Sequence, residues 1–149
     1  MSHVRQQIRE AAAGLLAAAP VNWQRVFIQR EAPLRVVLPY LLVYTPSESS
    51  TPLTLHNPFL LQRDLSLIVQ AHVRIANAEE VEKVFDAVSV EIEQKITLTK
   101  LKAVAAKLTG VTLINTQTDI VISESNERLY GELTMTWQAQ YHTVEGNPE

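Results

Sequence analysis

Hydrophobic and polar residues alternate along two long segments of the chain. Between residues 129 and 143 one parity carries mainly apolar side chains and the other carries polar ones, and residues 64–75 repeat the pattern. Because successive side chains of a strand point to opposite faces, both segments predict strands with one face against a core and one polar face. Such one-sided strands are typical of antiparallel or mixed sheets covered on a single face.

Helical periodicity appears in three other segments. Residues 3–19 carry apolar side chains at helical spacing, and Pro20 ends the run. A second helix begins near Asn77 and Glu80, which have capping-box spacing. Its apolar stripe is predicted to face the core and comprises Val81, Val84, Phe85, Val88 and Ile92.

A shorter third helix is predicted after the second. Thr97 or Thr99 would cap it, and Gly110 would end it. The residues expected to face inward are Leu101, Val104, Ala105 and Leu108.

Three further segments predict strands, at residues 23–28, 36–44 and 111–122. The 36–44 segment is almost continuously apolar, so it is expected to be buried on both faces or to lie centrally, although Pro39 suggests an edge or a bulge. The fold class is therefore α+β: a mainly antiparallel (mixed) sheet with about three helices packed on one face. We expect six apolar side chains to be buried together: Leu67, Val69, Phe85, Leu133, Met135 and Trp137.

Residues 45–62 differ from the rest, because Pro, Ser and Thr dominate their first half. They predict a long loop or a loosely held hairpin tip, and loops of this length are either functional or disordered. The chain of 149 residues otherwise suits one domain spanning 1–149, with a flexible tail at 144–149.

The charge is unevenly distributed along the chain. Residues 1–75 hold seven arginines and four acidic residues, a net charge of +3, whereas residues 76–149 hold six basic and twelve acidic residues, a net charge of −6. One interpretation is that the uneven charge arises by chance, together with one acidic helix. The other is that the subunit has a basic side and an acidic side, which would suit head-to-tail contacts. The overall net charge of −3 argues against a nucleic-acid binder.

No constellation of catalytic or metal-binding residues stands out. The chain has no cysteine, its four histidines lack metal-ligand spacing, and its four glycines are isolated, so neither a zinc site nor a phosphate loop is predicted. Asp64, Ser66 and His72 lie on one strand without a nucleophile elbow. We therefore expect a non-enzymatic interaction domain that needs no cofactor and no membrane. A small α+β enzyme with an unrecognised cleft is the alternative.

Four segments carry a resemblance to a known family: Leu38–Tyr44, Arg63–Val69, Leu98–Gly110 and Leu129–Thr136. In order they are a Pro-aliphatic-Tyr strand, the alternating strand after the polar loop, the final helix and the last alternating strand. In element order and local sequence the chain resembles the phage tail terminator proteins, the minor tail protein U group of lambda-like phages with long non-contractile tails.

The resemblance implies a structural protein of the virion. Such proteins form a ring, usually a hexamer, that binds the end of the completed tail tube, stops polymerisation of tube subunits and offers a surface for joining the head. The implied partners are further copies of the chain, the tail tube protein and a head-completion or neck protein, at the head-proximal end of the tail and in the host cytoplasm during assembly. A head–tail joining protein and a contractile-tail terminator are the alternatives.

Ten residues are candidates for ring or tube contacts. Tyr130 is either an exposed strand residue or an interface anchor. Phe59 and Leu60 would anchor the 45–62 loop, which also holds Glu48. The remaining candidates form an expected basic patch of Arg30, Arg35 and Arg63 and an expected acidic patch of Glu124, Glu127 and Glu132.

Overall fold

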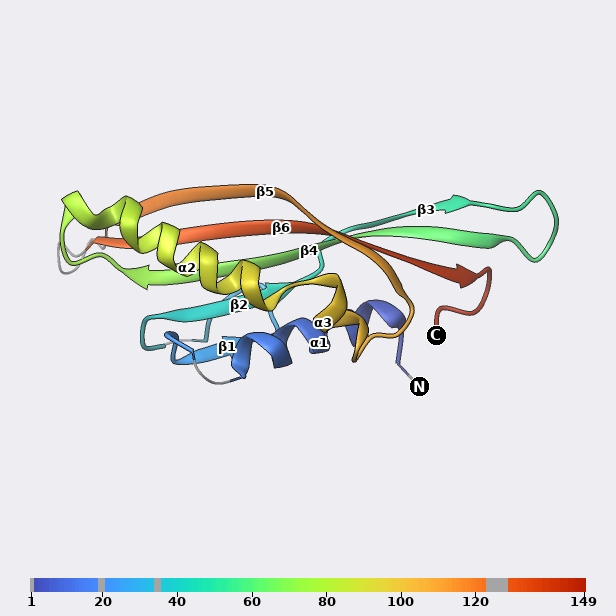
Figure 1. The fold of residues 1–149 in the computed structure, drawn as a ribbon, viewed down its shortest axis with the longest axis horizontal. Helices are drawn as coiled ribbons and strands as arrows, with labels where there is room; N and C mark the ends of the chain where they lie inside the picture. The colour runs from blue at the N-terminus through green and yellow to red at the C-terminus, as the bar shows by residue number, and fades with distance from the viewer. Residues whose placement is uncertain (1, 19–20, 34–35, 123–128) are drawn as a thin grey trace.

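The computed structural model describes residues 2–18, 21–33, 36–122 and 129–149. Three helices lie in front of a long sheet in Figure 1: α1 (Val4–Ala17), α2 (Val81–Lys95) and α3 (Leu98–Lys102). The strands are β1 (Arg25–Phe27), β2 (Tyr40–Tyr44), β3 (Glu48–Pro52), β4 (Leu60–Arg74), β5 (Leu108–Ile122) and β6 (Leu129–Val144). The α+β class predicted from the sequence is confirmed.

The sheet is mixed and mainly antiparallel. Its order is β1-β2-β4-β6-β5, and among the pairings of the described strands only that of β1 with β2 is parallel. β6 pairs along the whole of β4, so β2 and β3 share the other edge of β4: β2 pairs with residues 68–72 and β3 with residues 61–65. Because β2 has a strand on each side, it is central, as its apolar sequence predicted.

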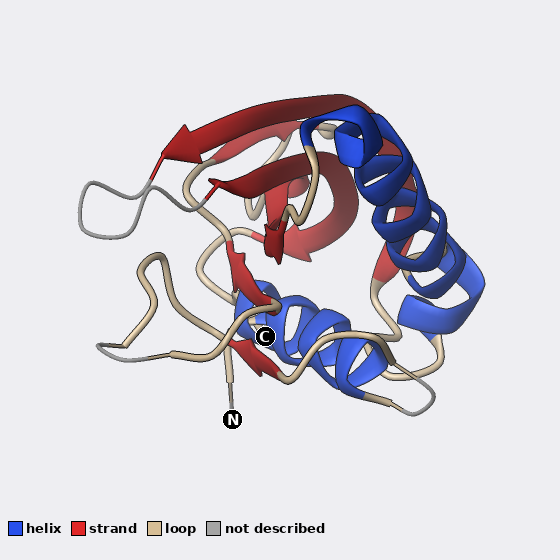
Figure 2. Cartoon of the chain, turned by 90° about the vertical axis from the view of Figure 1, so that its left-hand side faces the viewer, coloured by secondary structure: helices blue, strands red, loops and turns tan. Residues whose placement is uncertain are grey.

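One face of the curved sheet packs against the helices and forms the core (Figure 2). The six side chains predicted to be buried together all belong to this core. Its tightest point lies between α2 and β6, where a Cβ added to Gly131 would approach Phe85 Cζ to 2.6 Å. Glycine at this position lets the Phe85 ring lie directly on the β6 backbone. The alternating pattern of β4 and β6 therefore placed the core correctly.

Local capping explains where the second and third helices begin. The Asn77 side chain accepts a hydrogen bond from the Glu79 backbone N–H at 3.1 Å, in a 3₁₀ turn (Ala78–Glu80) that leads into α2. Thr97 caps α3 by accepting from the Lys100 N–H at 3.3 Å. Of the two caps proposed for the third helix, Thr97 is therefore the one used.

The end of the third helix was predicted wrongly. α3 ends at Lys102, and Gly110 lies inside β5 at a register shift, so it is not a helix stop. Val104 is exposed, although its spacing suggested an inward position. Leu101, Ala105 and Leu108 are buried as expected. Their spacing imitates a continuing helix, but the chain turns between them and Val104 points outward.

The 45–62 segment forms a hairpin, which was one of its two predicted forms. β3 and the first residues of β4 are its strands, and residues 53–59 connect them. At the other end of the chain, the tail predicted at 144–149 contacts α1, because the Val4 backbone N–H donates to the Pro148 carbonyl at 3.0 Å.

Candidate assembly surfaces

The β3–β4 hairpin projects from one end of the molecule. We call residues 48–65 the arm. It extends to the right in Figure 1, beyond the helices, with the last residues of β6 beside it. The arm is therefore an extension of the sheet that has no helical layer of its own.

A buried carboxylate ties the arm to the body of the protein. The Glu48 side chain is only 6% exposed and lies 3.4 Å from the Arg63 guanidinium and 3.5 Å from that of Arg5. It also accepts a hydrogen bond from the Tyr141 hydroxyl. Arg63 Nε in turn donates to Thr143 Oγ1 at 2.7 Å. The cluster thus joins α1, β3, β4 and β6.

The Glu48 carboxylate is surrounded by hydrogen-bond donors. Two guanidinium groups and one hydroxyl face a carboxylate that is withdrawn from water, and charge-assisted bonds of this kind are the strong ones. Burial, and then the hydrogen bond to Glu48, raise the pKa of Tyr141 well above its ordinary value, so its hydroxyl remains a donor. Glu48 and Arg63, predicted as surface contacts, are placed where they hold the arm in position.

The arm tip carries exposed apolar side chains. Leu55 is 101% exposed and Leu53 is also exposed, whereas Phe59 and Leu60 are half-buried. The Phe59 carbonyl accepts from the Glu145 N–H at 2.8 Å, which fixes the second limb of the tip to the end of β6. Among the apolar residues of the predicted loop, Leu55 is therefore the most accessible to a partner.

The face of the sheet opposite the helices carries an aromatic and acidic cluster. His72 stacks on Tyr40, with ring centroids 4.6 Å apart, and Tyr130 lies 6.4 Å away. His72 Nε2 bonds Gln70 Oε1 at 3.0 Å, while Nδ1 has no hydrogen-bond partner and lies 3.7 Å from Glu132. Burial lowers the pKa of His72, and the Glu132 charge opposes that effect.

Of the other six predicted contact residues, the structure describes three: Arg30, Tyr130 and Glu132. Arg30 is exposed in the segment after β1, far along the chain from Arg63. Arg35, Glu124 and Glu127 lie outside the described residues. Tyr130 is half-buried beside His72, so the structure brings it together with Glu132. Among the described strands none pairs with the outer side of β5, whose Ile114 and Ile120 are exposed.

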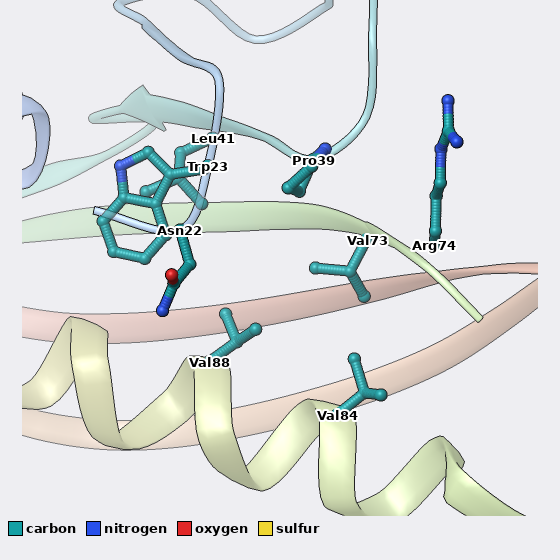
Figure 3. Close-up of a pocket in the computed structure, with 8 residues that line it drawn as sticks. All are labelled: Asn22, Trp23, Pro39, Leu41, Val73, Arg74, Val84 and Val88. Carbon is teal, nitrogen blue, oxygen red and sulfur yellow. The ribbon is translucent and has the colours of Figure 1, made fainter. Parts of the chain in front are cut away.

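A cavity of about 210 Å³ opens between α2 and the sheet. Figure 3 shows Val84 and Val88 of α2 pointing toward Val73 of β4, with Trp23 and Leu41 at the far side. Pro39, Asn22 and Arg74 complete its lining. The cavity is mostly apolar, and it lies toward the end of β4 that is remote from the arm.

Sequence reasoning missed the Glu48 cluster, Leu55 and this cavity. Arg63 and Tyr141 share the strand parity of buried residues such as Leu65 and Ala139. A charged residue on an apolar parity is a signal that it has a buried partner, and that signal could have identified the cluster. The cavity had no comparable signal, because its lining comes from four separate segments.

The described residues hold no group of three or more His, Asp or Glu side chains placed to bind a metal ion. Among the helices that the structure describes, none combines the length and the apolar character needed to cross a membrane.

Neither a family model nor a curated protein matches this sequence. Among solved structures, the fold is similar to that of a chain described as "Virion of native gene transfer agent (GTA) particle". The sequence identity is 13% and the TM-score is 0.44, over 95% of this chain and 92% of that one. The likeness is one of chain path only.

Proposed function

We propose that this protein is a structural component of a phage-like virion that caps the completed tail tube as a ring. In this role it ends tube polymerisation and presents a surface for head attachment. Its partners are further copies of itself, in a ring that we propose to be hexameric, the tail tube protein, and a head-completion or neck protein. It acts at the head-proximal end of the tail.

The observation that carries the proposal is the arm. A closed ring of identical subunits needs two different, complementary patches on each subunit. The arm projects beyond the helical layer at one end of the sheet and is tied down by the Glu48 cluster, and the opposite end presents a different surface. The sequence resemblance to tail terminator proteins, carried by residues 38–44, 63–69, 98–110 and 129–136, supports the same role.

The polar groups of the two clusters support a structural role as well. Glu48 is engaged by Arg5, Arg63 and Tyr141, and His72 is stacked on Tyr40 and bonded to Gln70. These side chains hold strands and helix together.

The test is a tube-growth experiment with the tail tube protein of the same particle. Tube protein is polymerised with and without the purified chain, and tube lengths and ends are measured by electron microscopy. We expect shorter tubes with a ring at one end. Chain unfolded by heat before addition is the control and should leave growth unchanged. Unchanged lengths and bare ends with the folded chain would contradict the proposal, and binding only to head–neck complexes would favour a joining protein.

A further inference from the structure

We propose that the arm tip of one copy inserts Leu55 into the cavity lined by Trp23, Val84 and Val88 of a second copy. This contact would be the head-to-tail joint of the assembly, so it deepens the proposed function and rests on the self-association which that function requires. The proposal pairs a fully exposed apolar side chain with an apolar cavity, both present in the same chain.

The cavity has the size and lining for an aliphatic side chain. Its volume of about 210 Å³ exceeds that of a ~150 Å³ apolar cavity that holds benzene. Three valines, Leu41 and the Trp23 ring supply most of its surface, as Figure 3 shows. On entering the cavity, the whole Leu55 side chain would be removed from water. This is the largest free-energy gain that a single leucine can make by burial.

The cavity is present in the folded chain, and polar contacts fix two of the residues that line it. Trp23 Nε1 donates to the Leu16 carbonyl at 2.7 Å, which fixes the indole. Asn22 bonds the Glu91 carboxylate of α2 twice, at 3.2 and 3.0 Å. A pre-formed site spares the ordering cost that a collapsing one would add on binding.

A chain cannot insert its own arm. The arm tip joins β4 at Leu60, its first residue, whereas Val73 and Arg74 at the other end of the same strand line the cavity. Thirteen residues of extended strand span roughly 40 Å. The hairpin tip and the cavity therefore lie toward opposite ends of β4, the long strand that Figure 1 shows running through the molecule. Only a second copy of the chain can bring Leu55 and the cavity together.

Charge at the two ends is complementary. Glu145 lies beside the arm tip, with its carboxylate 3.5 Å from the Phe59 N–H, and is exposed. Arg74 lies at the cavity, and it is exposed as well. When Leu55 enters the cavity these two side chains approach one another. Such a rim pair adds little affinity but fixes the orientation of the joint.

The contact is heterologous, because the patch on one copy differs from the patch on the other. An open row of subunits keeps one free arm at one end and one free cavity at the other, and a rotation that closes the row yields a ring. This geometry is what a capping ring needs.

Site-directed disulfide capture tests the contact directly, because the chain contains no cysteine. Leu55→Cys is prepared as its mixed disulfide with thionitrobenzoate and added at high concentration to Val84→Cys. The Val84→Cys thiolate attacks the activated sulfur, forms the inter-subunit disulfide and releases the thionitrobenzoate anion. We expect a covalent dimer on a non-reducing gel, formed at least ten times faster than with Val104→Cys, a matched control whose side chain is exposed elsewhere.

The outcomes separate the contact from the function. Equal rates for Val84→Cys and Val104→Cys would overturn the proposed joint. If tubes are still capped in that case, the proposed function stands and the ring closes through another surface. If the disulfide forms but tubes are not capped, the joint stands and the proposed function fails. A non-covalent check uses Leu55→Asp, which should abolish self-association measured by sedimentation, whereas Val104→Asp should leave it unchanged.

Discussion

The body and the arm use the same face of the same two strands in different ways. Under the helices, β4 and β6 present apolar side chains such as Leu67 and Leu133. Toward the arm, next to the start of α1, that face presents Arg63, Tyr141 and Thr143, which bond to Glu48 or to each other. The body is thus held by non-directional burial and the arm by a few directional polar contacts. Substitutions in the body should therefore unfold the protein, whereas those in the arm should act locally.

The largest effect is expected in the body, at Phe85. Replacing Phe85 by Ala removes a buried ring that packs on the β6 backbone, and such losses cost about 3–5 kcal/mol of unfolding free energy. Chemical denaturation measures the loss. Val90→Ala, an exposed position on the same helix, is the control and should change stability by less than about 0.5 kcal/mol. A loss at Phe85 no larger than at Val90 would mean that α2 does not cover the sheet.

A second test of the body adds one carbon atom. Gly131→Ala places a Cβ 2.6 Å from Phe85 Cζ, a contact that must displace a buried ring, and overpacking of this kind costs about 1–3 kcal/mol. Gly14→Ala is the matched control: its Cβ meets no atom within 4 Å and it lies in α1, so the variant should gain roughly 0.5–1 kcal/mol. Opposite signs in thermal or chemical unfolding are expected, and a neutral Gly131→Ala would contradict the tight packing.

In the arm, Glu48→Gln should loosen the hairpin without unfolding the body. The change keeps the shape of the side chain but removes the charge that pairs with Arg63 and Arg5, and hydrogen bonds to charged groups contribute about 1.5–3 kcal/mol. Because Arg5 is 43% exposed, its share is screened by water. Amide hydrogen exchange should speed up in residues 48–65 and stay unchanged in α2. Uniform acceleration would show that body and arm unfold as one unit.

The contrast between body and arm also explains what could be predicted from the sequence. The alternation in β4 and β6 and the stripe of α2 are local patterns, and each states by itself which side faces a core. They predicted the fold class and the core, whereas the central position of β2 was one of the alternatives that its own apolar run left open. An apolar face must be buried whichever segment of the chain covers it. The buried face could therefore be predicted without knowing which element packs against it.

The arm was not open to the same reasoning. β3 is Glu-Ser-Ser-Thr-Pro, a polar segment without alternation, and its strand form comes from backbone pairing with β4. The bond between Glu48 and Tyr141 joins residues 93 positions apart. The cavity needs β2, β4, α2 and the Asn22–Trp23 segment at once. Contacts between residues far apart in the sequence produce no periodic pattern in it. These sites could therefore be found only from the structure.

His72, on the face of the sheet opposite the helices, should make the stability of the protein mildly sensitive to acid. Burial holds its folded-state pKa below the unfolded value of 6.5, so the unfolded state binds more protons as pH falls through that value, and stability decreases. His3, whose pKa is also lowered, acts in the same direction. Between about pH 7 and pH 5, His72→Gln should lose less stability than the parent, by up to about 1.4 kcal/mol per pH unit. Equal slopes for both proteins would show that His72 stays accessible to protons when folded.

The smallest effect is expected from salt, and it decides which kind of contact joins the subunits. The uneven charge of the two halves of the chain predicts that assembly weakens as salt rises, because screening shortens to about 3 Å at 1 M. Exposed pairs such as Arg74 with Glu145 contribute only about 0–1 kcal/mol each, and Leu55 burial is not screened. Sedimentation from low to high salt should therefore show less than a tenfold loss of affinity, which corresponds to about 1.4 kcal/mol. A larger loss of affinity would show that charged contacts hold the subunits together. Arg30, which is the exposed arginine of the predicted basic patch, would then be the first residue to replace.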